Sequence, residues 1–390
     1  MPFLLAAVLC GAVFGNSFFK IGVGPLNVLG LFVLATGMTY LTVFVVSRSG
    51  KIKYQAARVS DKYLWAFFGV GIISVALSYL DVYFALFPEI PLLRDDSYIP
   101  RQAYYLFFVP MIILAGRNVD AGKALDWVSK NRVALFFLIW IAHIFFAKNL
   151  SLNVPCCFAL GLLLLMDKGE RKAVDVPMFA ILLLSPIAVG GEMTQVIIRV
   201  IALCIYAVGF NGKVLRYSLV GMIFVVLGCY ALPIMPLESF GFDANTAWRA
   251  EYWGNELVQL GKTFGLGVGY GTSYASTDFV GEALGGPFAA TTEYSATEKL
   301  FVVGCHNSFV SLFFRLGILG IASLFAYLLS LSKHAMEFKG GYMPSAAFAL
   351  ISSLVIVCFN VGFENPSYFF LLGFSLALTS SQMSCVGEGA

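Results

Sequence analysis

Charged residues are scarce in this chain, and their scarcity limits the class of protein it can be. Only 12% of the 390 residues are Asp, Glu, Lys or Arg, and there are three histidines. Soluble globular domains carry roughly 25% charged residues. Hydrophobic residues make up 59% of the chain, and apolar runs close to the ~20 residues needed to cross a hydrocarbon core recur along it. The composition excludes an ordinary soluble domain and predicts an all-α, polytopic integral membrane protein.

Strand-like alternation is also lacking. Membrane β-strands alternate apolar and polar residues over about ten positions, whereas segments such as 31–46 are apolar on every side. We therefore expect helical spans, about twelve in number, at residues 3–19, 25–46, 63–87, 103–117, 132–147, 153–167, 174–190, 193–210, 217–236, 306–331, 343–363 and 367–382. The first span is expected to be uncleaved, because no basic residue precedes it.

Metal-binding and redox motifs are missing as well. The eight cysteines show no CxxC spacing and have no histidine-rich companion segment, so we expect neither a metal site nor a cofactor. Most of them fall in apolar segments, where cysteine serves as a small core residue. Cys305 adjoins His306 and is an alternative nucleophile. No nucleic-acid partner is expected.

Lys and Arg residues gather in alternate loops between the expected spans. These residues are Arg48, Lys51, Lys53, Arg58 and Lys62; Arg117, Lys123, Lys130 and Arg132; Lys168, Arg171 and Lys172; Lys213 and Arg216; and Lys333 and Lys339. Positively charged loops face the cytoplasm, so both termini are expected there. The chain divides on this basis into spans one to nine (1–236), a large external loop (237–305) and the last three spans (306–390).

The external loop is long and acidic, and loops of this length are usually functional. Within it, the segment 244–260 has helical spacing of Trp248, Trp253 and two leucines, which predicts an amphipathic helix lying on the membrane. A G-x-G-x-G-x-G run follows at residues 265–271. Backbone of this kind can approach an anionic group closely.

His306 and Asn307 begin the most informative pattern of the chain. They stand where the external loop meets an apolar span, and nine residues separate them from Gly317, with Gly320 three positions later. An imidazole at a membrane surface can exchange protons near neutral pH. His306 is therefore a candidate general base, and the alternative is a capping or packing residue at a helix start.

Three arginines stand where a cation needs an explanation, because arginine within a bilayer costs at least ~2.5 kcal/mol unless it meets water or a counter-ion. Arg199 lies inside an apolar span, and we expect it to face a wet cavity, where its planar group suits phosphate oxygens. The alternative is an ion pair with Glu192. Arg249 lies in the external loop. Arg315 is expected to snorkel or to pair with Glu364 or Asp81.

These motifs together resemble the O-antigen ligase and polymerase superfamily. Its members have about twelve spans, a large periplasmic loop before the last spans and a His-Asn-x9-Gly-x-x-Gly signature. Arg249-x3-Trp253 followed by Gly265-x-Gly267-x-Gly269 is similar to the family's arginine segment and glycine turn. Arg199 stands where the family has a membrane-embedded arginine. The resemblance covers roughly residues 174–331.

The resemblance implies a GT-C-like, inverting, metal-independent glycosyltransferase in the bacterial inner membrane, with its active site facing the periplasm. Arg199 and Arg249 would hold the diphosphate of an undecaprenyl-diphosphate-linked glycan, and His306 would take the proton of an acceptor hydroxyl. Asn307, Trp253, Gly267 and Gly269 would support the site. The acceptor is either lipid A core, as in a ligase, or another lipid-linked glycan, as in a polymerase.

Two further interpretations stay open. Glu251, Glu256 and Glu293 are alternative catalytic groups if carboxylates rather than His306 carry the chemistry. A transporter or flippase for a lipid-linked or anionic saccharide is the alternative function, since many spans with buried arginines also suit an anionic cargo. The long external loop and the lack of repeat halves argue against transport.

Overall fold

The structure is a computed structural model. It describes residues 8–11, 21–23, 26–48, 61–104, 106, 113, 121–145, 161, 173–184, 193–208, 212–231, 244–276, 296–302, 307–335, 343–359 and 365–385. Within these ranges the chain is helical apart from turns, loops and one pair of two-residue antiparallel strands, β1 (Gly22–Val23) and β2 (Leu26–Asn27). The all-α prediction is confirmed for the described part of the chain.

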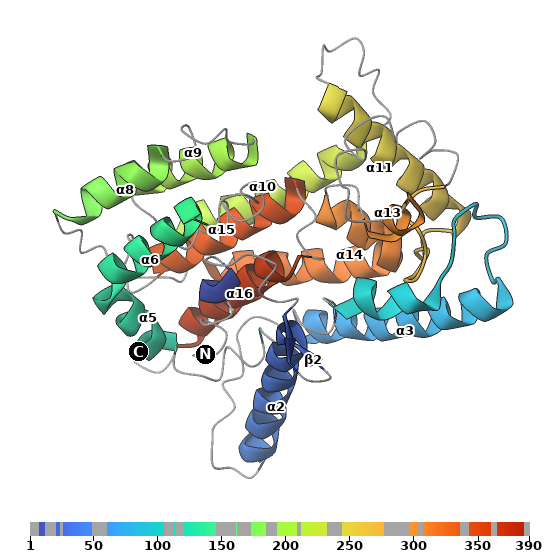
Figure 1. Ribbon diagram of the computed structural model, residues 1–390, viewed down its shortest axis with the longest axis horizontal. Helices are drawn as coiled ribbons and strands as arrows, with labels where there is room; N and C mark the ends of the chain where they lie inside the picture. The colour runs from blue at the N-terminus through green and yellow to red at the C-terminus, as the bar shows by residue number, and fades with distance from the viewer. Residues whose placement is uncertain are drawn as a thin grey trace.

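The helices follow the apolar segments of the sequence (Figure 1). They are α2 (Val28–Arg48), α3 (Lys62–Phe84), the short 3-10 helix η1 (Asp96–Tyr98), α5 (Ala121–Lys130), α6 (Arg132–Phe145), α8 (Asp175–Leu184), α9 (Met193–Val208), α10 (Gly212–Ala231), α11 (Ala244–Lys262), α13 (Ala296–Val302), α14 (Ser308–His334), α15 (Met343–Phe359) and α16 (Pro366–Cys385). Nine of the twelve expected spans overlap one of these helices. The other three, 3–19, 103–117 and 153–167, lie mostly outside the described residues.

Three of the described helices, α3, α10 and α14, are long and apolar enough to cross a membrane. Shorter apolar stretches occur in α2, α6, α8, α9, α15 and α16. These helices expose large hydrophobic side chains, among them Ile73 of α3, Phe224 of α10 and Ile318 of α14. A hydrocarbon environment accommodates such side chains on a helix surface. The protein is therefore a helical membrane protein, as its composition predicts.

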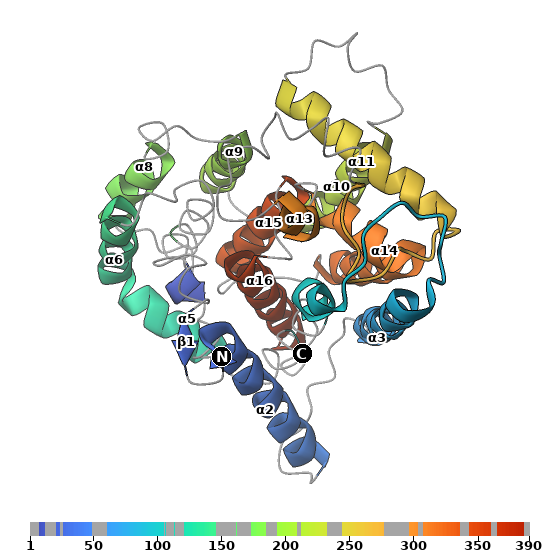
Figure 2. The same ribbon diagram turned by 45° about the vertical axis from the view of Figure 1, so that its right-hand side comes forward.

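The core of the molecule lies around α15 and α16, which pack against each other. Figure 2 shows these two helices near the centre, with the other helices around them. Every described side chain of α15 from Ser345 to Cys358 is buried. A helix that is apolar on all sides is typical of such a central position. Around this centre, α14 packs against α3 and α10, and α9 packs against α15.

A buried ion pair joins α6 to α8 across the outer layer. The guanidinium of Arg132 donates through Nε to Asp175 Oδ1 at 2.8 Å and through Nη2 to Oδ2 at 3.2 Å. Both residues are at least nine-tenths buried. This two-point geometry fixes the relative position of the first residues of the two helices.

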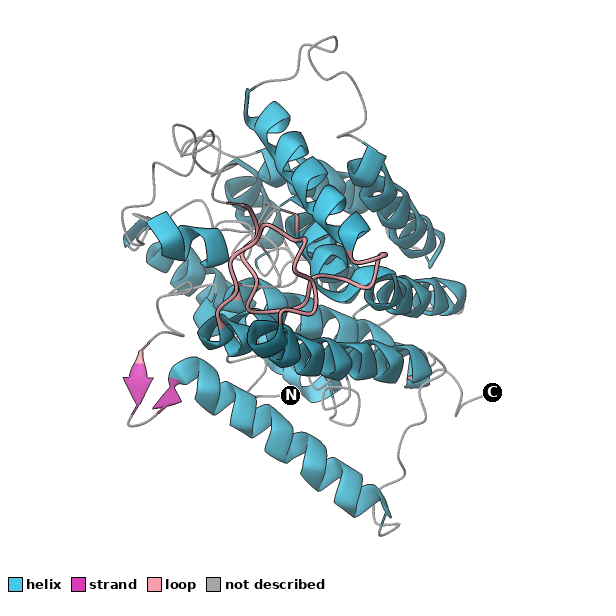
Figure 3. Ribbon diagram, turned by 90° about the vertical axis from the view of Figure 1, so that its right-hand side faces the viewer, coloured by secondary structure: helices cyan, strands magenta, loops and turns pink. Residues whose placement is uncertain are grey.

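The described loops gather at one end of the helices, where residues 85–95 and 263–276 lie beside each other (Figure 3). Helix α11 leads into this region and packs against α14 and α10. The helix predicted over 244–260 is confirmed by α11. The candidate site is built at this end.

Candidate functional site

Helix α14 is broken at Gly317, within the His-Asn-x9-Gly-x-x-Gly pattern. Gly317 has φ 66° and ψ −165°, a conformation outside the helical region. A residue in this conformation interrupts the regular i to i−4 hydrogen bonds. The break leaves the carbonyl groups of Phe314 and Arg315, and the N–H of Ile318, to bond elsewhere.

The glycine loop, residues 264–274, occupies this break. The N–H groups of Val268 and Gly269 donate to the carbonyl oxygens of Phe314 and Arg315, at 2.8 Å and 3.2 Å. The N–H of Ile318 donates in turn to the carbonyl of Gly265 at 2.9 Å. The loop therefore replaces the missing turn of α14 as its hydrogen-bonding partner.

Glycine is required where the two segments meet. Gly267 has φ 94°, and a Cβ there would lie 2.5 Å from the carbonyl oxygen of Arg315. Gly269 has φ 78°, and its Cβ would collide with Ser78 Oγ. A Cβ on Gly317 would collide with the backbone of Gly265. Gly267 and Gly269 thus permit the close approach of the loop to α14 and α3.

The expected anion-binding use of this run does not hold for most of its donors. Besides Val268 and Gly269, Tyr270 N–H donates to Ser78 Oγ at 2.6 Å and Gly271 N–H donates to Gln102 Oε1 at 2.8 Å. Four successive N–H groups are therefore engaged within the protein. The glycine run serves as a structural clasp between α3, α14 and residue 102.

The side chain of Arg315 stabilises the glycine loop by hydrogen bonds from within the protein. Its side chain is fully buried, and Nη1 donates to the carbonyl oxygens of Gly269 at 3.0 Å and Thr272 at 2.7 Å. The guanidinium lies over the ring of Tyr274, 4.1 Å from its centroid. The predictions that Arg315 snorkels or pairs with Asp81 are wrong, because the guanidinium finds carbonyl dipoles inside the fold; Glu364 lies outside the described residues.

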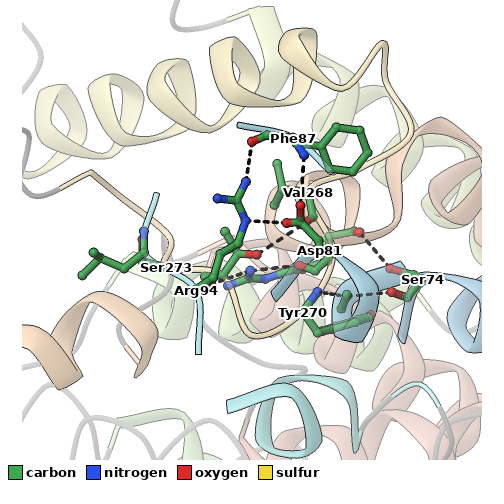
Figure 4. Close-up of polar contacts among 12 residues, drawn as sticks. Ser74, Asp81, Phe87, Arg94, Val268, Tyr270 and Ser273 are labelled. Carbon is green, nitrogen blue, oxygen red and sulfur yellow. Dashed lines mark hydrogen bonds and ion pairs between the residues drawn. The ribbon is translucent and has the colours of Figure 1, made fainter. Parts of the chain in front are cut away.

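Asp81 instead pairs with Arg94, just beyond the end of α3 (Figure 4). Its other oxygen, Oδ1, accepts from the N–H of Phe87 at 3.0 Å, and Arg94 Nη2 donates to the carbonyl of Phe87. Asp81 is 3% exposed. One carboxylate therefore fixes the turn that follows α3.

The turn after α3 is joined to the glycine loop by backbone hydrogen bonds. Asp95 N–H donates to the carbonyl of Gly271 at 2.7 Å, and Ser273 N–H donates to that of Leu93 at 2.8 Å. The Gln102 amide donates to the carbonyl oxygens of Thr272 and Phe301. The result is a rigid wall of loops at the end of α3 and α14.

Asn307 caps α14 at the residue that follows His306. Its side-chain Oδ1 accepts from the N–H groups of Phe309 at 3.0 Å and Val310 at 3.2 Å, and the residue is fully buried. This is the usual satisfaction of first-turn N–H groups. His306 itself, with Cys305, lies outside the described residues. The cap fixes the backbone at Asn307 and the first turn of α14, directly after His306 in the sequence.

Three helices meet at Asn307. The side chain of Cys229 of α10 lies next to those of Asn307 and Cys358 of α15. Tyr230 of α10 also donates through its hydroxyl to the carbonyl of Phe309, at 3.1 Å. The start of α14 is therefore held by the ends of α10 and α15.

Arg249 and Trp253 lie on α11, whose inner face packs against α14 and α10. Arg249 is half-buried, Trp253 is buried in the core, and Glu256, two turns after Arg249, is fully buried. Glu251 is exposed. Of the alternative carboxylates, Glu256 alone among the described ones shares the inner face; Glu293 lies outside the described residues.

Arg199 lies on α9 and is 8% exposed. Helix α9 packs against α15, whereas Arg249 sits on α11 against α14. The structure thus brings the helices of Arg249 and Asn307 into direct contact and connects Arg199 to them through α15. Glu192, the alternative partner of Arg199, lies outside the described residues.

Sequence reasoning missed Arg315, Ser74 and Ser78 as parts of this wall. Ser74 Oγ donates to the carbonyl of Arg315 at 3.3 Å, and Ser78 links the loop to α3. A signal was present for Arg315, because it stands two residues before the helix-breaking Gly317. Nothing in the sequence of α3 marks the two serines. Among the described residues, no cluster of three His, Cys, Asp or Glu side chains is placed to hold a metal ion.

No protein-family model matches the chain, and no curated protein matches it in a sequence search.

Proposed function

We propose that the protein is an inverting glycosyltransferase that moves a glycan from undecaprenyl diphosphate to an acceptor hydroxyl. The proposal includes a GT-C-like fold of about twelve spans in a bacterial inner membrane, with the site on the periplasmic side. Its substrates are a lipid-linked glycan donor and either lipid A core or a second lipid-linked glycan. It is the activity of the O-antigen ligase and polymerase superfamily, which the motifs resemble.

One observation supports this proposal most: the precise anchoring of Asn307. The Asn307 side chain is buried, caps α14 and lies next to Cys229 of α10. A general base needs a fixed position relative to the proton that it takes. The residue before Asn307 has such an anchor on its carboxyl side, and that residue is His306.

Arg249 supports the proposal from the neighbouring helix. It lies on the inner face of α11, which packs against α14, the helix that His306 precedes. A guanidinium presents a planar fork to phosphate oxygens and stabilises charge on a departing diphosphate. Arg199, buried on α9, is proposed as the second diphosphate ligand.

The reaction is a single displacement. The acceptor hydroxyl oxygen attacks the anomeric carbon while His306 takes the hydroxyl proton. The bond from that carbon to the diphosphate oxygen breaks, its electron pair leaves with undecaprenyl diphosphate, and the anomeric configuration inverts. The two arginines stabilise the leaving charge, so this scheme requires no metal ion.

The decisive experiment uses purified full-length protein with undecaprenyl-diphosphate oligosaccharide, with and without lipid A core. A single core-linked product identifies a ligase, and a ladder formed without core identifies a polymerase. His306→Ala should lower transfer by about 10²–10⁴-fold, the usual contribution of a general base. Addition of EDTA should leave the rate unchanged.

Matched variants separate the roles of the cations. Arg249→Ala and Arg199→Ala should weaken donor binding and so raise the KM for the donor. Arg216 is an exposed arginine of α10, and Arg216→Ala should leave this KM unchanged. His334→Ala at the other end of α14 is the control for His306. Wild-type protein that forms no glycosidic bond with competent substrates, but moves the lipid-linked saccharide between leaflets, would replace the enzyme by a flippase.

A further inference from the structure

The turn between α11 and the glycine loop presents apolar side chains outward. Phe264 is 93% exposed and Leu266 is 59% exposed. Phe264 also has φ 54°, a left-handed conformation that a residue with a Cβ adopts at a cost of about 1–2 kcal/mol. A large aromatic side chain held out in a strained turn needs an environment that accepts it.

The glycine loop lies near one end of two candidate membrane spans, but it contacts both of them inside their length. It contacts α14 at Phe314–Ile318 and α3 at Ser78, and then continues to residues 93–95 beyond the end of α3. Since the loop runs toward the start of α14 and past the end of α3, these two helices are antiparallel (Figure 1). Their far ends carry Lys62 and Lys333.

Helix geometry gives the depth of the loop. Ser78 stands sixteen residues after Lys62 and Gly317 sixteen residues before Lys333, which is about 24 Å of helix at 1.5 Å per residue. A hydrocarbon core is about 30 Å thick. Measured from charged residues at the far end of either span, both contacts of the loop therefore lie inside the hydrocarbon layer.

The backbone of the turn is suited to that depth. The N–H groups of Phe264, Gly265 and Leu266 donate at 3.1 Å to carbonyl oxygens of residues 260–263. Irregular backbone is tolerated at membrane depth only when its polar groups are satisfied by protein. The side chains beside it on α14, Ile318 and Leu319, are each 58% exposed and continue the apolar surface.

The charged residue Lys262 stands just before the apolar turn, at the end of α11. Lys262, the last residue of α11, is exposed, and its Nζ lies 3.4 Å from the carbonyl of Glu89 in the turn after α3. A lysine at the membrane boundary keeps its ammonium group at the membrane surface, while the residues that follow can enter the hydrocarbon layer. The transition from surface to hydrocarbon thus occurs between Lys262 and Phe264.

We infer that residues 264–266 form a re-entrant tip that inserts among lipid acyl chains, in the leaflet on the α11 side. The occupant of this apolar surface is lipid hydrocarbon, because the surface is continuous with the lipid-facing sides of α3 and α14 at the same depth. The tip fixes the end of α11 at the level of the lipid headgroups. This inference stands independently of the proposed enzymatic activity.

A photo-reactive residue at position 264 tests the insertion. Full-length protein carrying p-benzoylphenylalanine in place of Phe264 is reconstituted in phosphatidylcholine vesicles, irradiated and analysed by mass spectrometry. Adducts on the acyl chains are expected. The substitution touches no buried side chain, and elution at the wild-type volume in size-exclusion chromatography verifies the fold.

Two matched positions calibrate the result. Ile73, 60% exposed in the middle of α3, should give acyl-chain adducts, and the exposed Glu251 in the first half of α11 should give none. Adducts at position 264 confined to headgroups, or their absence while Ile73 reacts, would overturn the inference. Since the assay contains no glycan, a failure of transferase activity leaves its outcome unchanged.

Discussion

The Asn307 side chain caps α14 and thereby fixes the start of this helix, where the candidate site lies. Its oxygen satisfies two first-turn N–H groups of α14. Asn307→Ala removes both hydrogen bonds, and loss of such a cap costs about 1 kcal/mol. We expect a lower Tm in detergent together with reduced transfer, since the anchor beside His306 is loosened.

Asn307→Asp is the informative companion of that variant. The aspartate retains an oxygen that accepts from the Phe309 and Val310 N–H groups, and a negative charge is favourable at a helix start. It should recover most of the Tm lost in Asn307→Ala. If the alanine variant melts and reacts like wild type, the cap has no part in stability or activity.

Arg315 differs from the two proposed diphosphate ligands because its guanidinium donates hydrogen bonds to the protein backbone. Nη1 already bonds two carbonyl groups of the glycine loop, and the guanidinium stacks on Tyr274. Arg315→Met leaves buried carbonyl oxygens without this donor, at about 1–3 kcal/mol each. We expect a large fall in Tm, measured by thermal denaturation, with Arg315→Lys only partly restoring it.

A selective loss would contradict that structural role. If Arg315→Met keeps the wild-type Tm but raises the donor KM, Arg315 belongs to the substrate site rather than to the clasp. Arg249→Ala provides the contrast, because its expected effect is on KM with little change in Tm.

At the scale of elements, the break in α14 and the glycine loop form one unit. Gly317→Ala places a Cβ against the backbone of Gly265 and forces alanine to φ 66°. Strain of this kind costs of order 1–3 kcal/mol in addition to the collision. We expect Gly317→Ala to lower Tm and to expose the glycine loop to proteolysis.

Glycines of α10 provide the matched control for that prediction. Gly221 and Gly228 have open space where a Cβ would stand and no left-handed φ. Alanine at either position should leave Tm unchanged or raise it, because alanine is favoured over glycine inside a helix by up to ~1 kcal/mol. Equal losses at Gly317 and Gly228 would show that the break is not specially constrained.

The sequence predicts the helices well because a continuous apolar run leaves few alternatives in a membrane. It also marks α11, through the spacing of Trp248 and Trp253. The glycine clasp could not be predicted, since its partners are separated by long stretches of chain. Ser78 and Gly269, for example, meet only when α3 packs against α14. The same limit explains the wrong prediction for Arg315, whose carbonyl partners carry no side-chain signal.

For the whole molecule, the distribution of charge is the feature that sets orientation. Lys333 and His334 stand at the end of α14, and the connection from α14 to α15 carries Lys339, whereas the segment from α11 to α14 is long and acidic. Positive charge is retained on the cytoplasmic side. On this basis we expect the proposed site, at the start of α14, to face the periplasm.

Two Gly-Gly dipeptides allow a matched test of this orientation. A protease recognition sequence is inserted between Gly285 and Gly286, and in a second variant between Gly340 and Gly341. Protease added to intact spheroplasts should cut only the first variant, and detergent should make both sensitive. Cleavage of the second alone would place the start of α14 in the cytoplasm, where the proposed transfer from a periplasmic donor is impossible. The orientation therefore bears directly on function, because a site for lipid-linked glycans works only in the leaflet that presents them.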